Sequence, residues 1–203
     1  LGDVYKRQEL ELDAVSEVPR YYVCNAYGVC GIYSAPGTAV KEAYDTSGIV
    51  TNDRGVTVWL KGNRVSRNQI MAIKEESVTE QKNSLAVCLD NILRHAGITR
   101  NTEYDLAQGK TATTILSENM TGVQVLDLSG CTLDAVLYYV NQDIPVLAIL
   151  EDGEAVLVTG FNEFNVVIME PATGKLYKKG MNDATAWFAE NGNHFITYMR
   201  TEN

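Results

Sequence analysis

Hydrophobic and polar positions change period along this chain, and the changes mark out short strands and helices. Apolar residues that alternate, or that form continuous β-branched runs, predict strands. These lie at residues 21–24, 31–33, 48–51, 56–60, 123–128, 144–150, 155–161, 165–170, 175–180 and 194–200. Helical spacing predicts helices at residues 38–48, 132–142 and 182–192, and two shorter ones between residues 102 and 120.

The clearest helical pattern lies in "SVTEQKNSLAVCLDNILRHAG", residues 77–97. Ser77 and Glu80 match a capping box, which predicts that the helix begins there. Gly97 predicts its end. One apolar face of this helix consists of Leu85, Cys88, Leu89, Ile92 and Ala96.

The order of these elements predicts two parts. Residues 21–74 read as a small β-rich domain of the form strand-strand-helix-strand-strand, preceded by a linker at residues 9–20. Residues 77–203 read as a second domain in which helices precede an antiparallel sheet, which is an α+β order. Residues 1–8 contain "DVYKRQ", which is similar to the translated end of a transposon used in sequencing libraries. We expect this segment to be a sequencing artefact that replaces the natural N-terminus.

Composition and charge narrow the possible partners. The chain has 203 residues, of which 45% are hydrophobic, and this is enough for folded domains with cores. Its formal net charge of −9 argues against a nucleic-acid partner, because that binding depends on Lys and Arg neutralising phosphates. No apolar run approaches the roughly 18 residues of a membrane-spanning helix, so we expect no membrane insertion.

The four cysteines are Cys24, Cys30, Cys88 and Cys131. Cys24 and Cys30 flank "NAYGV" and are expected to be free thiols, with a disulfide across a hairpin as the alternative. The sequence has no CxxC pair and only two histidines, so we expect no metal site and no cofactor.

Four motifs in residues 77–200 resemble the C39-like branch of the papain-like cysteine peptidases. They are "QKNSLAVCLDNILRHAG", "TLDAVLYYVNQDIPVLAIL", "EAVLVTGF" and "EPATG". The resemblance places the nucleophile at Ser84, the general base at Glu154 and the orienting residue at Glu170. It places the oxyanion glutamine at Gln81.

These substitutions remove the chemistry of the family. Hydrolysis of this type needs a thiolate at a helix N-terminus and an imidazole that transfers a proton near neutral pH. A serine and a glutamate do neither in this setting. The resemblance therefore implies a non-catalytic domain that binds a peptide or protein ligand at a remnant of the cleft, in an exported bacterial protein that is secreted or on the cell surface.

Two other functions are compatible with the sequence. Cys88 or Cys131 could act as a displaced nucleophile, which would make the chain an active cysteine peptidase. Cys88 lies on the apolar helix face and Cys131 precedes the expected helix cap Thr132. The structural interpretation of both is a buried core thiol. The third function is a structural module of a surface protein.

The expected hairpin at residues 155–170 makes a geometric prediction. The turn "FNEFN" places Glu154 either directly opposite Glu170 or diagonal to it, with both carboxylates on one face of the sheet. We expect that face to look toward Ser84.

Overall fold

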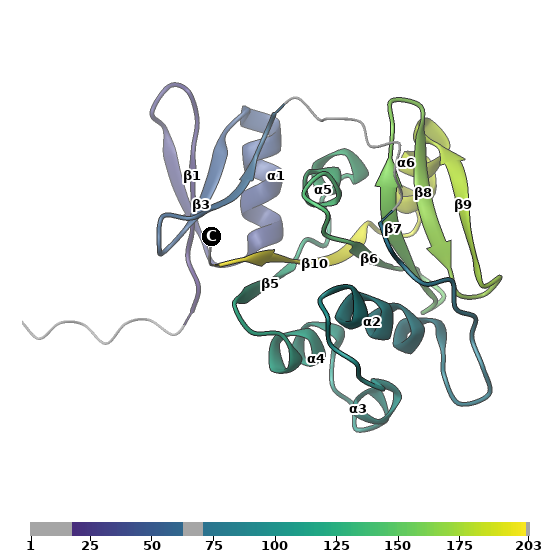
Figure 1. Cartoon of the computed structure of the whole chain (residues 1–203). Helices are drawn as coiled ribbons and strands as arrows, with labels where there is room; N and C mark the ends of the chain where they lie inside the picture. The colour runs from purple at the N-terminus through teal and green to yellow at the C-terminus, as the bar shows by residue number, and fades with distance from the viewer. Residues whose placement is uncertain (1–17, 63–70, 202–203) are drawn as a thin grey trace, which may run out of the picture.

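The structure is a computed structural model that describes residues 18–62 and 71–201. It shows a mixed α/β protein with two antiparallel sheets, placed side by side in Figure 1. Segment 1–8 and most of the linker expected at residues 9–20 lie outside the described residues.

The smaller sheet has the strand order β2-β1-β3-β4, and α1 covers one of its faces. Pro36 occupies the first turn of α1, where a missing N–H costs nothing. The strands and the helix of this smaller part are β1 (Tyr21–Cys24), β2 (Cys30–Tyr33), α1 (Pro36–Thr46), β3 (Ile49–Asn52) and β4 (Thr57–Leu60). Cys24 lies opposite Cys30 in the β1–β2 hairpin, and the two form a disulfide rather than the expected free thiols. The hairpin register brings their Cα atoms to 4.2 Å.

The larger sheet has the order β5-β10-β6-β7-β8-β9, with every neighbouring pair antiparallel. Its strands are β5 (Val123–Asp127), β6 (Val146–Ile149), β7 (Ala155–Phe161), β8 (Asn165–Glu170), β9 (Lys175–Gly180) and β10 (His194–Arg200). The helices are α2 (Ser84–His95), α3 (Glu103–Ala107), α4 (Ala112–Asn119), α5 (Leu133–Val140) and α6 (Met181–Glu190). Helix α2 packs with α4 on one side of this sheet, and α5 packs with α6 on the other (Figure 1).

Helix α2 begins later than the capping box predicts. Its N-cap is Asn83, whose side chain accepts a hydrogen bond from the Ala86 N–H at 2.9 Å. Next to Ser77, the Val78 N–H instead bonds to the Pro171 carbonyl, in the turn that follows β8. Asparagine is as good an N-cap as serine, so the contact with this turn decides between the two starts.

Helix α2 ends as predicted. Gly97 has φ +84°, and the Ile98 N–H bonds back to the Leu93 carbonyl. On the predicted apolar face, Cys88, Leu89 and Ile92 are fully buried. Ala96 lies beyond the last turn and is exposed.

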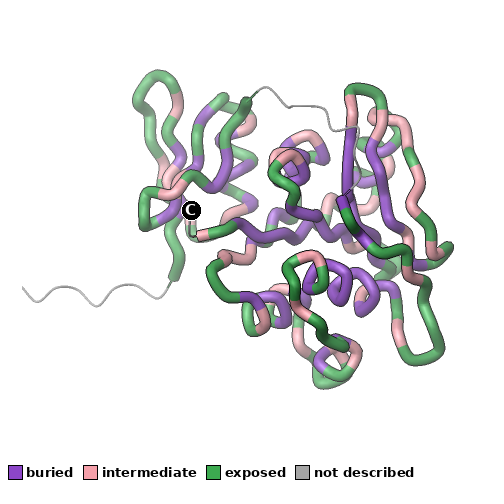
Figure 2. The backbone as a smooth tube through the Cα atoms, in the orientation of Figure 1, coloured by how far each residue is buried: buried purple, intermediate pink, exposed green. Residues whose placement is uncertain are grey.

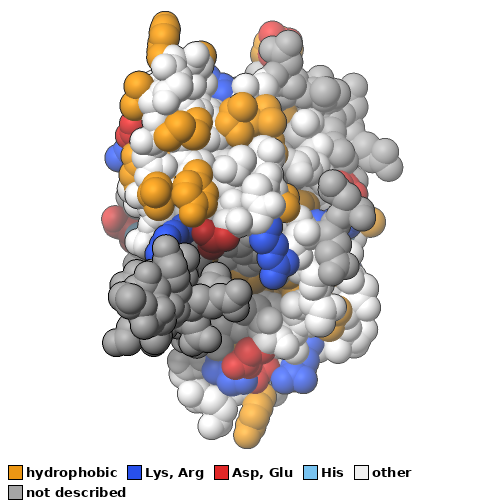
Figure 3. Space-filling view, turned by 90° about the vertical axis from the view of Figure 1, so that its left-hand side faces the viewer, with side chains coloured by type: hydrophobic (Ala, Val, Ile, Leu, Met, Phe, Trp, Pro, Cys, Tyr) orange, Lys and Arg blue, Asp and Glu red, His pale blue; other side chains and the backbone are white. Residues whose placement is uncertain are grey.

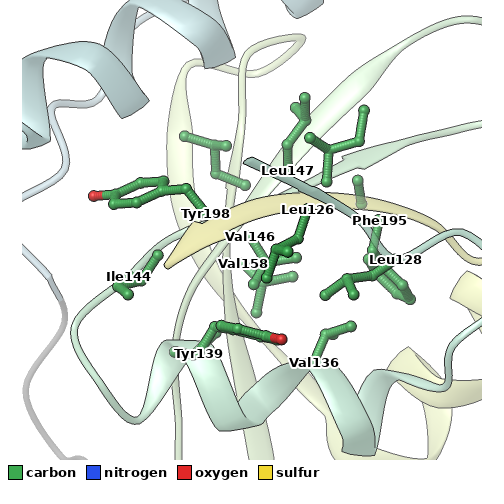
Figure 4. Close-up of a cluster of buried hydrophobic side chains, with 14 of the residues drawn as sticks. Leu126, Leu128, Val136, Tyr139, Ile144, Val146, Leu147, Val158, Phe195 and Tyr198 are labelled. Atoms are coloured by element: carbon green, nitrogen blue, oxygen red, sulfur yellow. The ribbon is translucent and has the colours of Figure 1, made fainter. Parts of the chain in front are cut away.

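One continuous hydrophobic core joins both sheets, and buried segments run through α2 and the central strands in Figure 2. Figure 4 shows part of this core, where Val136 and Tyr139 of α5 face Val146 and Val158 of the larger sheet. The Tyr139 hydroxyl also donates to the Val58 carbonyl of β4 at 3.1 Å. Helix α5 therefore contacts both sheets.

Residues 71–78 contact the larger sheet at β7 and at β9. Met71 is buried and its N–H bonds to the Thr159 carbonyl, while a Glu75 carboxylate oxygen accepts the Leu176 N–H at 3.0 Å. The division of the chain between residues 74 and 77 stays a prediction, and these contacts attach residues 71–76 to the larger sheet. Within the described ranges, no helix is both long and apolar enough to cross a membrane.

Candidate functional site

The N-terminus of α2 meets the start of β7, and Ser84 makes the contact. The Ser84 Oγ accepts a hydrogen bond from the Ala155 N–H at 2.8 Å, across 71 residues of sequence. Ser84 is only 2% exposed. Its hydroxyl oxygen thus satisfies a buried backbone donor.

Glu154 immediately precedes this contact and lies at the surface. Its backbone carbonyl accepts the Leu150 N–H, and its N–H bonds to the Asp152 side chain. The Glu154 carboxylate also acts on α2, because it raises the pKa of Cys88 in addition to the larger effect of burial. Ser84, Cys88 and Glu154 therefore form one neighbourhood.

Glu170 belongs to a different neighbourhood. Its carboxylate accepts a hydrogen bond from Thr173 Oγ1 at 3.0 Å. It also raises the pKa of Tyr177 on β9, where burial is again the larger cause. The described contacts of Glu170 are thus with the β8–β9 turn and β9.

The hairpin register gives the positions of the two glutamates along the paired strands. Leu157 pairs with Met169 and Val158 with Ile168, which matches the diagonal arrangement of the two glutamates. The pairing shifts between Val158 and Gly160, on the turn side of these pairs, so the register at the glutamates is not disturbed.

Continuing the register places Glu170 beside Val156, in a row with Ala148 and Phe195. Phe195 packs on Phe188 of α6, with ring centroids 5.2 Å apart. Alternation of side chains therefore directs Glu170 toward α6 rather than toward α2 and Ser84.

Gln81, the expected oxyanion residue, is exposed in the loop before α2. Its backbone N–H bonds to Thr79 Oγ1 at 3.3 Å, within a local turn at residues 79–82.

The two alternative nucleophiles are buried and have raised pKa values. Burial raises the pKa of Cys88 well above its ordinary value. Burial also raises the pKa of Cys131 to about 12, and its Sγ donates to the Gly37 carbonyl at 3.3 Å. Because the thiolate is the nucleophile, both thiols are poorly reactive in the folded protein.

Neither histidine lies in the Ser84 neighbourhood. His95 is at the opposite end of α2, about 16 Å along the helix axis, and its Nε2 donates to the Asp143 carbonyl. His194 pairs with Ile149, which pairs with Ala155. Two strand spacings of about 4.8 Å each separate His194 from Ala155.

The sequence did not indicate two cavities that lie among the described residues. One of about 430 Å³ lies between the sheets and is lined by polar groups that include Asn52, Arg54 and Gln124. The other, of about 120 Å³, lies between Trp59 and Tyr138. Their linings come from segments far apart in the chain, and none of the residues expected from the resemblance takes part. No group of three or more His, Cys, Asp or Glu in the described ranges is placed to hold a metal ion.

Comparison with known proteins gives matches at the level of the fold. Neither a family model nor a curated protein matches the sequence. A solved structure of a candidate C39-like peptidase from Bacillus anthracis superposes with a TM-score of 0.53 at 13% identity, covering 68% of this chain and 100% of that one. A double-glycine-motif protease of an AMS/PCAT transporter, solved with a leader peptide, gives a TM-score of 0.44 at 14% identity, covering 66% and 94%. This chain is therefore similar in fold to a C39-like peptidase.

Proposed function

We propose that the chain is a non-catalytic domain of C39-like fold that binds a peptide or protein ligand beside the N-terminus of α2. The observation that carries the proposal is the bond between Ser84 Oγ and the Ala155 N–H. Ser84 lies at the position that the resemblance gives to the nucleophile, but its side chain is buried and has a structural role. The positions of the base and of the orienting residue hold Glu154 and Glu170, which cannot replace an imidazole near neutral pH.

The charges around this contact support a cationic ligand. Glu80 precedes α2, and Asp152 and Glu154 precede β7, and all three are exposed. The nearest cation in sequence, Lys82, is paired with Asp90 and Glu76. The surface beside Ser84 is thus acidic, which favours association with Lys and Arg side chains.

Binding of unstructured peptides tests the proposal. An unlabelled basic peptide and an acidic peptide of equal length are titrated into the protein by calorimetry at low salt. We expect the basic peptide to bind, more weakly as salt is added, and Glu154→Gln to weaken it. Glu118→Gln is the matched control, because Glu118 lies on α4 and is paired with Lys110. Equal binding of both peptides, or no binding at all, would contradict the proposal.

Hydrolysis is tested separately. We expect no cleavage of peptide substrates by the protein, nor by a variant in which Cys88 and Cys131 are both alanine. Cleavage that disappears in this variant would instead support an active peptidase with a displaced thiol.

Export to the cell surface or the medium is part of the proposal. The Cys24–Cys30 disulfide supports it, because disulfides persist mainly in oxidising compartments. Thiol counting on protein taken directly from the producing cells tests it, with two free thiols expected and four contradicting it.

A further inference from the structure

The cavity of about 430 Å³ between the two sheets has walls of polar side chains. They come from the β3–β4 turn, with Asn52, Asp53 and Arg54, and from the ends of β5 and β10, with Gly122, Gln124 and Thr201. Small-molecule sites have volumes of this order and occur preferentially between two parts of a fold. Figure 3 looks onto the side of the molecule that carries the smaller sheet, and shows acidic and basic side chains at mid-height, below the hydrophobic upper part.

The β3–β4 turn fixes the direction of the Asn52 amide. The Gly55 N–H bonds to the Asn52 carbonyl at 2.9 Å, and Gly55 has φ +72°, so residues 52–55 form a tight turn. The Asn52 side-chain oxygen accepts the N–H groups of Arg54 and Val56, at 3.0 and 2.9 Å. Because both partners are donors, the amide nitrogen points the other way. Asn52 is 7% exposed, so this direction is set inside the protein.

The amides of Asn52 and Gln124 form a directed chain between the sheets. Asn52 Nδ2 donates to Gln124 Oε1 at 3.2 Å, and Gln124 Nε2 donates to the Tyr21 hydroxyl at 2.9 Å. Each amide nitrogen carries two hydrogens. One hydrogen of each is used in this chain, and the second has no partner among the described residues. Both side chains line the cavity, whose wall therefore has N–H donors in fixed positions.

Arg54 adds a positive charge to the same wall. Its side chain is exposed. Within the described ranges, the arginines that form ion pairs are Arg94 and Arg100, so the Arg54 guanidinium is free to contact a ligand. A guanidinium presents its donors in a planar fork that matches the two oxygens of a carboxylate.

Asp53 limits the charge of the ligand. Its carboxylate accepts the Arg20 N–H at 3.0 Å and the Tyr22 hydroxyl at 3.4 Å. Its charge also contributes to the raised pKa of Tyr21, for which burial is the largest cause, so Asp53 lies close to the chain of amides. A doubly charged phosphate would be repelled by Asp53 more strongly than a singly charged carboxylate.

We propose that this cavity binds a small organic acid, with its carboxylate on Arg54 and a second oxygen on the amide N–H groups of Asn52 and Gln124. The unused groups of the wall are donors, and the Asp53 carboxylate is already bonded, so a matching ligand supplies acceptors. An N-acylated amino acid has this combination, because a carbonyl oxygen lies close to its carboxylate. The C-terminal residue of a peptide presents the same groups.

This site is separate from the surface beside Ser84. In the larger sheet, β10 and β6 lie between β5 and β7. Three strand spacings, or about 14 Å, therefore separate the two places. A ligand in the cavity contacts both sheets, so its binding should also stabilise the fold.

Titration of the full chain, followed by amide NMR spectra, tests the proposal with N-acetyl-L-alanine as the probe. We expect saturable shifts of the Gly122 backbone amide and of the Asn52 and Gln124 side-chain amides, with a Kd on the order of 1 mM. N-acetyl-L-alanine amide lacks the charge and should bind at least about tenfold more weakly. Inorganic phosphate should also bind more weakly than the acid.

Substitution of Arg54 tests the position of the carboxylate. Arg54→Gln should weaken binding of N-acetyl-L-alanine at least about tenfold, and Arg54→Lys should weaken it less, since it keeps the charge without the fork. Lys61→Gln is the matched control, because it removes the same charge at the other end of the β3–β4 hairpin, and should change the Kd less than about twofold. Both Arg54 and Lys61 are exposed, so the variants should fold.

An acetylated tripeptide that ends in alanine distinguishes the two sources of the ligand. Tighter binding than that of N-acetyl-L-alanine would support a peptide C-terminus, and equal or weaker binding would support a free acid. Absence of binding by the acid up to about 50 mM would overturn the proposal. So would equal binding of the acid and its amide, tighter binding of phosphate, or a Kd that Arg54→Gln leaves unchanged.

Discussion

At the scale of single residues, Ser84 has a structural role and the two free thiols lie in the core. The Ser84 hydroxyl replaces water as the partner of the buried Ala155 N–H. Cys88 is enclosed by α2 and the sheet, and Cys131 by the contact between α5 and α1. The Ser84 hydroxyl and the two thiols are thus bonded to a backbone group or removed from solvent. An activated nucleophile needs the reverse, namely a nearby base or a lowered pKa.

Replacement of Ser84 by alanine tests this structural role. Ser84→Ala leaves the Ala155 N–H buried without its acceptor, which should lower the free energy of unfolding by about 1–3 kcal/mol. Urea denaturation followed by circular dichroism measures the change. Ser117→Ala is a suitable control, because Ser117 is exposed on α4. A Ser84→Ala protein as stable as the wild type would show that water or another group satisfies the N–H.

The raised pKa values predict slow alkylation of the free thiols. With the pKa of Cys131 at about 12, its thiolate fraction is small at pH 7 and should rise about tenfold per pH unit up to pH 9. Cys88 should follow the same trend, since its pKa is also raised. Intact-mass spectrometry after iodoacetamide treatment measures the rates. Unfolding in guanidinium should restore fast labelling, and fast labelling of either thiol in the folded protein at pH 7 would contradict the prediction.

At the scale of elements, α2 joins the Ser84 neighbourhood to the core of the larger sheet. Its first turn carries Ser84, and its buried face carries Cys88, Leu89 and Ile92. Asp90 on the same helix accepts the Thr102 N–H at 2.9 Å and pairs with Lys82, which holds the segments before and after the helix. A buried charge is tolerated there because it has both partners.

Truncation of a core leucine measures how tightly α2 is packed. Leu89 is fully buried, so Leu89→Ala should cost about 2–5 kcal/mol of unfolding free energy. Leu85→Ala on the same helix is the control and should cost less, because Leu85 is only partly buried. Chemical denaturation of both variants gives the comparison. A loss below about 0.5 kcal/mol for Leu89→Ala would place it among surface substitutions.

At the scale of the whole molecule, α5 connects the two sheets. Trp59 of β4 is 2% exposed, and its Nε1 donates to the Ala135 carbonyl at 3.0 Å. Tyr138 packs against the same indole, with ring centroids 6.2 Å apart. These contacts are buried and come from segments about 80 residues apart, so they couple the stability of the two parts.

Loss of the indole donor tests this coupling. Trp59→Phe keeps an aromatic ring but removes the hydrogen bond from the indole N–H to the Ala135 carbonyl, which should lower the unfolding free energy by about 0.5–1.5 kcal/mol. If the sheets unfold together, the wild type should show a single unfolding transition. Far-UV circular dichroism and thiol exposure should both report that transition. Trp187→Phe is the control, since Trp187 lies on α6, away from the contact between the sheets. Two separate transitions in the wild type would show that the sheets unfold independently.

The sequence by itself determined the elements, because their signals are local. Hydrophobic periodicity and turn residues placed the strands and helices of the described residues within a few positions, except for the start of α2. Gly97 and Thr132 also mark the predicted helix ends, through a left-handed glycine and a side-chain cap. The capping box at Ser77 was wrong because a second local signal, Asn83, was equally good and the neighbouring Val78 is bonded to Pro171 in the turn after β8.

Only the tertiary structure decided what the candidate residues contact. The Ser84–Ala155 bond, the burial of Cys88 and Cys131 and the direction of Glu170 toward α6 all depend on how distant segments pack. A sequence gives the residue type and shows which positions of a strand share a face. Which helices cover that face depends on how the whole chain packs. The Cys24–Cys30 bond shows the same limit at short range. Six residues of separation allow it, and the hairpin register brings the two Cα atoms to 4.2 Å.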